Sequence, residues 1–136
     1  MHFVWFANLF GIVLIGGVLL LERSPLAYGN LPFPVLNSPV KAGEAIHLRV
    51  RRCNNDDRVR VYDVSRVLVG ADGGQFILTP LKITIDPKCE TVVSKINIIP
   101  ADTPPGKYTL RGYGEINGFI RTHMVQWQSV EFVVTP

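Results

Sequence analysis

Apolar and polar residues alternate in short runs along most of the chain, from residue 45 to the C-terminus. Between 45 and 53, Ile46, Leu48 and Val50 alternate with polar residues, as they do in a strand with one buried face. The other runs expected to be strands are 58–69, 75–85, 90–99, 107–116 and 119–134. With an edge strand at 35–40, these runs make about seven strands separated by turn residues, a pattern that predicts an all-β antiparallel sandwich.

The phase of each run predicts which side chains face the core. The expected inward residues are Val59, Val61, Val67, Val69, Leu81, Ile83, Ile85, Val92, Ile96, Ile98, Val130, Phe132 and Val134. Asp63 and Ser65 interrupt the phase of the second run, so we expect a bulge or a strand end there. Asn117-Gly118 predicts a two-residue hairpin turn, because both central positions of a type I′ turn need a positive φ.

The front of the chain has a different pattern. Phe3 to Leu21 is a stretch of nineteen residues without a charge, in which Asn8 alone is polar. As a helix it would rise about 28 Å, which is close to the hydrocarbon thickness of a bilayer. Trp5 near its start suits an interfacial anchor. We therefore predict one N-terminal transmembrane helix within residues 1–23.

A cleaved signal peptide is the alternative, since Ala27-Tyr28-Gly29 is a small-x-small site. Three features favour a retained anchor: the run is long for a signal peptide, no Lys or Arg precedes it, and Glu22-Arg23 separates it from the cut. Residues 24–39 contain four of the ten prolines and are expected to be an extended, semi-rigid linker. Residues 40–136 remain for the β domain.

One segment of this domain carries a family resemblance. Thr103 to Leu110 reads TPPGKYTL, a Pro-Gly turn followed by a tyrosine and an inward aliphatic residue. It resembles the entry into the penultimate strand of many bacterial and viral immunoglobulin-like domains, and the resemblance covers about residues 35–136 at the level of fold. The chain departs from antibody domains because its third strand has no tryptophan and Cys89 precedes the fifth strand. The resemblance implies a strand order and no function.

In that strand order, the strand that ends at Cys53 and the strand that begins at Cys89 are antiparallel neighbours. Both cysteines then lie on the outer face, and we predict a disulfide between them. Closing a loop of about 36 residues would stabilise the fold by roughly 3–4 kcal/mol in the chain-entropy model. Two unrelated reduced cysteines are the alternative. A disulfide implies an oxidising compartment and so a periplasmic or extracellular domain, whereas the charges around the front run do not determine orientation.

The sequence contains no motif for catalysis or metal binding. GxSxG, HExxH, P-loop and GxGxxG patterns are missing, and the two cysteines lack zinc-ligand spacing. The net charge of +3, from 14 basic and 11 acidic residues, is too small to call for a polyanionic partner. We therefore expect no enzyme activity, cofactor, metal or small-molecule substrate, and we do not expect nucleic acid as a partner.

Two groups of residues are candidates for a binding face. Six arginines fall within eighteen residues, namely Arg49, Arg51, Arg52, Arg58, Arg60 and Arg66. They could bind lipid head groups, nucleic acid or an acidic partner, although a solvated face balanced by Asp56, Asp57 and Asp63 is the favoured interpretation. Tyr113 and Trp127 would anchor a protein interface if exposed, and core packing is the favoured interpretation for Trp127.

These features together predict a single-span membrane protein with an extracytoplasmic domain. We expect a non-catalytic interaction or structural module, an accessory subunit of a larger membrane or envelope complex, whose partners are the lipid bilayer and other membrane or envelope proteins. Small proteins of this layout also occur in tailed-phage genomes, an analogy that adds a viral origin to the hypotheses. The alternatives are a secreted, signal-cleaved binding or chaperone-like domain, a polyanion-binding protein and an enzyme with a diffuse site.

Overall fold

The computed structural model describes residues 23–136, and the predicted anchor from Phe3 to Leu21 lies outside them. The described chain is all-β. Its strands are β1 (Leu26–Gly29), β2 (Val40–Lys41), β3 (Ala45–Asn54), β4 (Arg60–Gly70), β5 (Gln75–Ile85), β6 (Cys89–Ile98), β7 (Gly106–Asn117), β8 (Thr122–Gln128) and β9 (Phe132–Thr135). Over this range, no helix is present that could cross a membrane.

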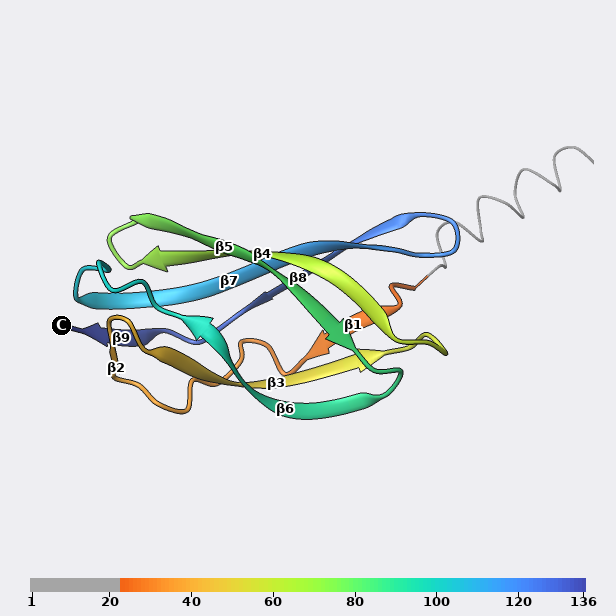
Figure 1. Ribbon diagram of the computed structural model, residues 1–136, viewed down its shortest axis with the longest axis horizontal. Coiled ribbons are helices and arrows are strands. Elements are labelled where there is room, and N and C mark those ends of the chain that lie inside the picture. The colour runs from red at the N-terminus through yellow and green to blue at the C-terminus, as the bar shows by residue number, and fades with distance from the viewer. Residues whose placement is uncertain (1–22) are drawn as a thin grey trace, which may run out of the picture.

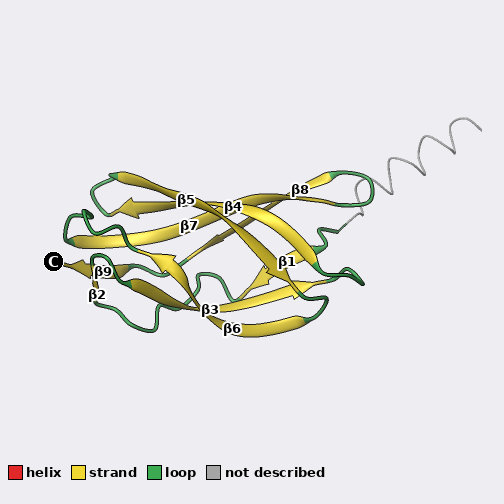
Figure 2. Ribbon diagram, viewed as in Figure 1, coloured by secondary structure: helices red, strands yellow, loops and turns green. Residues whose placement is uncertain are grey.

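The strands form two sheets. One has the order β1-β3-β6, and the other has the order β2-β9-β7-β4-β5, with β8 also paired to β7. Neighbouring strands are antiparallel except β2 and β9, which pair in parallel. Figure 1 shows β3 and β6 on one side of the molecule and β4, β5 and β7 on the other, and Figure 2 shows that strands make up most of the described chain.

The hydrophobic core draws side chains from both sheets. Ile46 and Leu48 of β3 are fully buried, as are Val64 and Leu68 of β4 and Leu110 of β7. Burying each such side chain stabilises the fold by roughly 1.5–3 kcal/mol relative to leaving it exposed. The predicted alternation of 45–53 is therefore confirmed.

The predicted phase of the second run is wrong. Val61 is 53% exposed, while Tyr62, Val64 and Leu68 face the core together with Arg66. The prediction followed the valines Val59, Val61, Val67 and Val69, but the other phase of this strand is also rich in apolar residues.

The expected irregularity near Asp63 and Ser65 is present, but the extra residue is on the partner strand. Val64 pairs with Leu81, and Arg66 pairs with Leu78. Between these two pairs, β5 has Thr79 and Pro80 where β4 has Ser65 alone. The extra stretch contains Pro80, which cannot donate a hydrogen bond to the ladder. The expected inward position of Ile85 is confirmed.

The phase predicted for β6 holds only in its first half. Val92 is half-buried and packs against the core, but Ile96 and Ile98 are exposed and Asn97 is 2% exposed. The register shifts between Ile46 and Leu48 of β3, where β6 carries one extra residue. One extra residue exchanges the two faces of a strand from that point on, so the isoleucines turn outward.

The Asn117-Gly118 signal marks a hairpin, but the turn is longer than predicted. Asn117 pairs with Thr122, and the loop between them is 118–121, closed by a hydrogen bond from the Gly118 amide to the Arg121 carbonyl (2.8 Å). The expected last strand, 119–134, is two strands, β8 and β9, which pair with different parts of β7. Phe132 and Val134 face the core as predicted.

The expected linker is packed against the sheets. Leu26 and Phe33 are each 1% exposed, and the Phe33 amide donates a hydrogen bond to the Gln128 carbonyl (2.8 Å). Strand β1 pairs with β3, and the expected edge strand at 35–40 is reduced to a bridge between Val35 and Leu48 and to β2. The apolar residues of this segment attach it to the core.

Candidate interaction surfaces

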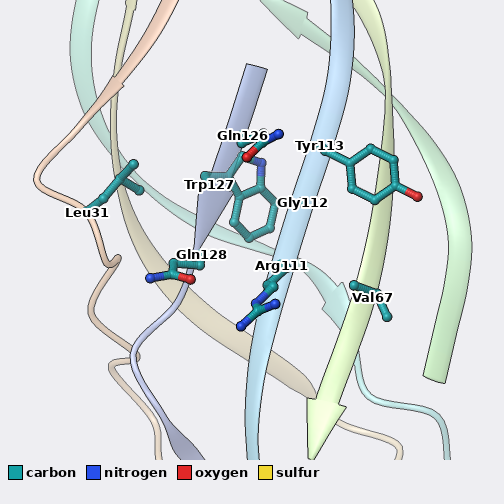
Figure 3. A pocket seen from close by; sticks show the side chains of 8 residues that line it. All are labelled: Leu31, Val67, Arg111, Gly112, Tyr113, Gln126, Trp127 and Gln128. Carbon is teal, nitrogen blue, oxygen red and sulfur yellow. The ribbon is translucent and has the colours of Figure 1, made fainter. Parts of the chain in front are cut away.

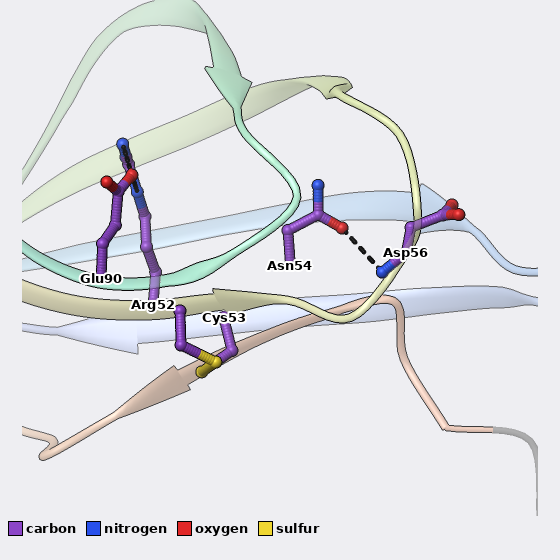
Figure 4. The surroundings of a disulfide bond; sticks show 6 residues. Arg52, Cys53, Asn54, Asp56 and Glu90 are labelled. Carbon is purple, nitrogen blue, oxygen red and sulfur yellow. Dashed lines mark hydrogen bonds and ion pairs between the residues drawn. A yellow bond between two sulfur atoms is a disulfide. The ribbon is translucent and has the colours of Figure 1, made fainter.

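The predicted disulfide is present. Cys53 of β3 and Cys89 of β6 are bonded partners and stand directly opposite each other in the sheet. Figure 4 shows the bond beside the end of β3. The antiparallel register brings the end of one strand to the start of the other, as the sequence argument required.

The structure does not gather the candidate binding residues on one face. Arg49 and Arg51 lie on β3, and Arg49 is exposed. Arg58 lies in the loop between β3 and β4, and Arg60 is the first residue of β4. Both form ion pairs with Asp56. Arg66 is buried in the core.

The two aromatic candidates lie on adjacent strands and border the same hollow of the surface, but their exposure differs. Tyr113 of β7 is 47% exposed, whereas Trp127 of β8 is 8% exposed. The Trp127 indole packs against Phe33, with ring centroids 5.8 Å apart, and covers Gly112, where it leaves no room for a Cβ atom. Trp127 is therefore a core residue, as the favoured interpretation had it.

A polar cluster lies next to the disulfide and was missed by sequence reasoning. Arg52 of β3 donates hydrogen bonds to Glu90 of β6, with Nη2 to Oε1 at 3.0 Å (Figure 4). The hydroxyl groups of Tyr28 and Tyr62 are hydrogen-bonded to each other. The register of the disulfide could have revealed the ion pair, because pairing Cys53 with Cys89 also pairs Arg52 with Glu90.

The electrostatics of this cluster are those of a structural site. The hydrogen bond from Arg52 holds the pKa of Glu90 below its usual range. Burial raises the pKa of Tyr62 far above its usual range and also raises the pKa of Tyr28. The carboxylate therefore stays ionised and both hydroxyls stay protonated at neutral pH.

The loop after β3 is fixed by Asn54, which is 3% exposed. Its Nδ2 donates to the carbonyls of Arg58 and Ile85, both at 3.0 Å, and its Oδ1 accepts from the Asp56 amide at 3.0 Å. Asp56 in turn accepts from Arg60 Nη1 at 3.0 Å and Arg58 Nε at 3.4 Å. Hydrogen bonds from Asp57, with a contribution from Arg58, lower the pKa of Asp56. The arginines here are partly neutralised, as the solvated-face interpretation expected.

A shallow groove of about 480 Å³ runs along β7 and β8 (Figure 3). Its lining includes Arg111, Tyr113, Gln126, Gln128 and Val67. These side chains come from adjacent strands of one sheet, so their spacing is set by a rigid ladder. Nearby, Met124 of β8 is 53% exposed. Tyrosine, methionine and arginine are enriched in protein interfaces, so this composition suits contact with another protein.

Among residues 23–136, no three His, Cys, Asp or Glu side chains lie close enough together to hold a metal ion. No protein-family model matches the chain, and no curated protein matches it in sequence. Among solved structures, it is similar to the alkylpurine DNA glycosylase AlkC of Pseudomonas fluorescens bound to DNA containing an abasic site analogue. The TM-score is 0.47 and the identity 11%, over 85% of this chain and 32% of the glycosylase chain.

Two sequence-based exclusions are corrected on this finding. The chain was expected not to be an enzyme and not to have nucleic acid as a partner, yet the matched protein is an enzyme bound to DNA. Neither exclusion is retained. A TM-score of 0.47 assigns neither activity to this chain.

Proposed function

We propose that the two sheets are the layers of an immunoglobulin-like sandwich. The order β1-β3-β6 corresponds to strands A, B and E, and β9-β7-β4-β5 corresponds to G, F, C and C′. The core contributed by both sheets supports this proposal.

Tyr108, at the start of β7, supports the same proposal. It is 6% exposed, and its hydroxyl donates a hydrogen bond to the Pro104 carbonyl at 2.7 Å. A buried tyrosine at the start of strand F that bonds back to the preceding turn is the tyrosine corner of immunoglobulin-like sandwiches. The TPPGKYTL segment carries both partners of this bond.

We propose that the chain is a membrane-anchored interaction or structural module, an accessory subunit of a larger membrane or envelope complex. The uncharged stretch from Phe3 to Leu21 would anchor it, and the disulfide fits a domain outside the cytoplasm. The observation that carries the interaction function is the exposed outer face of β7 and β8 around Tyr113 and Met124. Its partner would be another membrane or envelope protein.

The secreted, signal-cleaved alternative is less well supported. Its cut after Ala27-Tyr28-Gly29 would remove β1, which pairs with β3 from Leu26 to Gly29. Leu26 would be lost from the core with it. We therefore favour a retained anchor. The N-terminal mass of the mature protein separates the two hypotheses.

The test is co-purification of tagged full-length chain from membranes in mild detergent. We expect a stoichiometric partner with the native chain. Tyr113→Ser should reduce its recovery about tenfold or more, because exposed aromatic anchors often contribute 2 kcal/mol or more to binding. Ile98→Ser is the matched control, since Ile98 is 59% exposed on β6, in the other sheet. A native chain that elutes alone as a monomer, or a Tyr113→Ser variant that keeps its partner, would refute the proposal.

A further inference from the structure

The described chain begins at a distinct end of the molecule. The start of the described chain, the loop 55–59 and the hairpin loop 118–121 lie at one end, and the C-terminus lies at the other (Figure 1). A single hollow at this end is lined by Arg23, Arg58, Gly118 and Phe119, among other residues. We call residues 23–25, 55–59 and 118–121 the N-terminal pole.

The covalent chain ties this pole to the predicted anchor. Glu22 alone separates Leu21 from Arg23, and two residue steps span at most about 7 Å. The head-group layer between hydrocarbon and water is roughly 5–8 Å thick. If Phe3 to Leu21 spans a bilayer, as the proposed function requires, the pole is held against the head groups.

The pole presents apolar side chains where a bilayer would meet them. Phe119 is 98% exposed and Ile120 is 39% exposed. The loop that carries them is closed by the hydrogen bond from Gly118 to Arg121 and by one from Thr122 Oγ1 to Asn117 Oδ1 (3.1 Å). A phenylalanine exposed to water on a short, closed loop gains about 25 cal/mol for each Å² that it buries in an apolar layer.

The charges of the pole fit the same surroundings. Its arginines are Arg23, Arg58 and Arg121, against Asp56 and Asp57. The Arg58 side chain is 71% exposed. Guanidinium groups bind phosphate oxygens, and each basic residue near an anionic surface contributes about 1 kcal/mol.

We propose that the N-terminal pole is a membrane-contact surface. Phe119 and Ile120 enter the interface of the bilayer that holds the anchor, and the arginines of the pole lie at the level of the lipid phosphates. The domain then stands on its N-terminal pole, and the sheet faces and the C-terminal end remain available to other proteins.

The test places a tryptophan at the pole of the full-length chain, reconstituted in vesicles whose acyl chains carry bromine. Trp5→Phe serves as the background. In Phe119→Trp, we expect blue-shifted emission quenched at least about twofold, because interfacial side chains reach roughly 5–10 Å into the acyl boundary. Ile77→Trp, at a position on β5 that is 87% exposed, should show no quenching beyond the background.

The outcomes separate this inference from the proposed function. If the chain does not float with the vesicles, the anchor is wrong and both proposals fall. If it floats and Phe119→Trp is quenched no more than Ile77→Trp, the membrane-contact surface alone is wrong.

A second comparison tests the arginines. In vesicles rich in phosphatidylglycerol, Arg58→Gln should reduce the quenching of the Phe119→Trp variant, whereas Arg49→Gln, on the exposed face of β3, should not. Equal effects of the two substitutions would contradict the role of the pole charges.

Discussion

At the scale of single residues, Arg66 is the least expected feature. It is 5% exposed, and its Nη1 and Nη2 donate to Asn97 Oδ1 (2.9 Å) and the Thr79 carbonyl (2.6 Å). Among the described residues, its Nε has no hydrogen-bond partner. Burial lowers the pKa of Arg66. An amide and a carbonyl therefore stabilise a buried cation, and the fold depends on both.

Asn97→Leu should destabilise the chain by about 2–3 kcal/mol, because the buried guanidinium loses one of its two acceptors. Adding Arg66→Leu should recover most of this loss, since it removes the charge as well. Denaturation midpoints in mild detergent measure both effects. Ile98→Leu, at the exposed neighbouring position, is the control and should stay within about 0.5 kcal/mol of the native chain. A double variant no more stable than Asn97→Leu would contradict this account.

At the scale of elements, the pairing of β3 with β6 combines a covalent bond and an ion pair. The Cys53–Cys89 bond closes a loop of 36 residues, and Arg52 and Glu90 pair at the adjacent position. The ion pair is partly exposed, so its contribution to the free energy of unfolding is small. Its main effect is on how that free energy changes with pH.

The sign of this pH dependence follows from Glu90. Its pKa is lower in the folded state than the ordinary value of 4.5, so the unfolded chain binds more protons in acid. The stabilising contribution is complete above about pH 5 and is lost as the pH falls through the folded pKa. Glu90→Gln should therefore be less stable than the native chain at neutral pH, and this difference should shrink as the pH falls through the folded pKa of Glu90.

Denaturation midpoints measured from neutral to acidic pH test this expectation. In an Arg52→Gln background, Glu90→Gln should have a smaller effect, because the main donor is gone and Lys88 Nζ, 3.5 Å from Glu90 Oε2, remains. A stability difference that does not change with pH would show that the ion pair is not its source.

At the scale of the whole molecule, the segment 24–39 is part of the domain. Phe33 lies between Tyr28 and Trp127, with ring centroids 5.6 and 5.8 Å away. The segment therefore runs directly from the end of the predicted anchor into the core. This arrangement holds the N-terminal pole close to the membrane in the proposed function.

Phe33→Ala should cost about 3–5 kcal/mol, the usual penalty for emptying a buried aromatic site. Leu31→Ala, two residues away and 45% exposed, is the matched control and should cost far less. Chemical denaturation of the full chain in detergent measures both. If Phe33→Ala cost as little as Leu31→Ala, the segment would behave as a free linker.

The sequence by itself determined the all-β class, the strand at 45–53, the disulfide and the hairpin at Asn117. The strand follows from alternation with a clearly polar opposite face, and the hairpin follows from its turn residues. The disulfide follows from one simple register, because the two cysteines lie at the ends of neighbouring antiparallel strands. The candidate binding residues were chosen one by one. Those on β3 belong to one sheet and those on β4, β7 and β8 to the other, and Tyr113 and Trp127 face opposite sides of their sheet.

The tertiary structure alone decided which apolar phase of β4 is buried, where β6 turns its isoleucines outward, and how the segment 24–39 packs. In β4 both phases are apolar, so the choice depends on contacts with distant strands. In β6 an extra residue opposite His47 exchanges the two faces. Arg66 can be buried only because Asn97 and Thr79, from two other strands, supply its acceptors. Alternation along a chain is local, whereas burial is settled by what lies across the core.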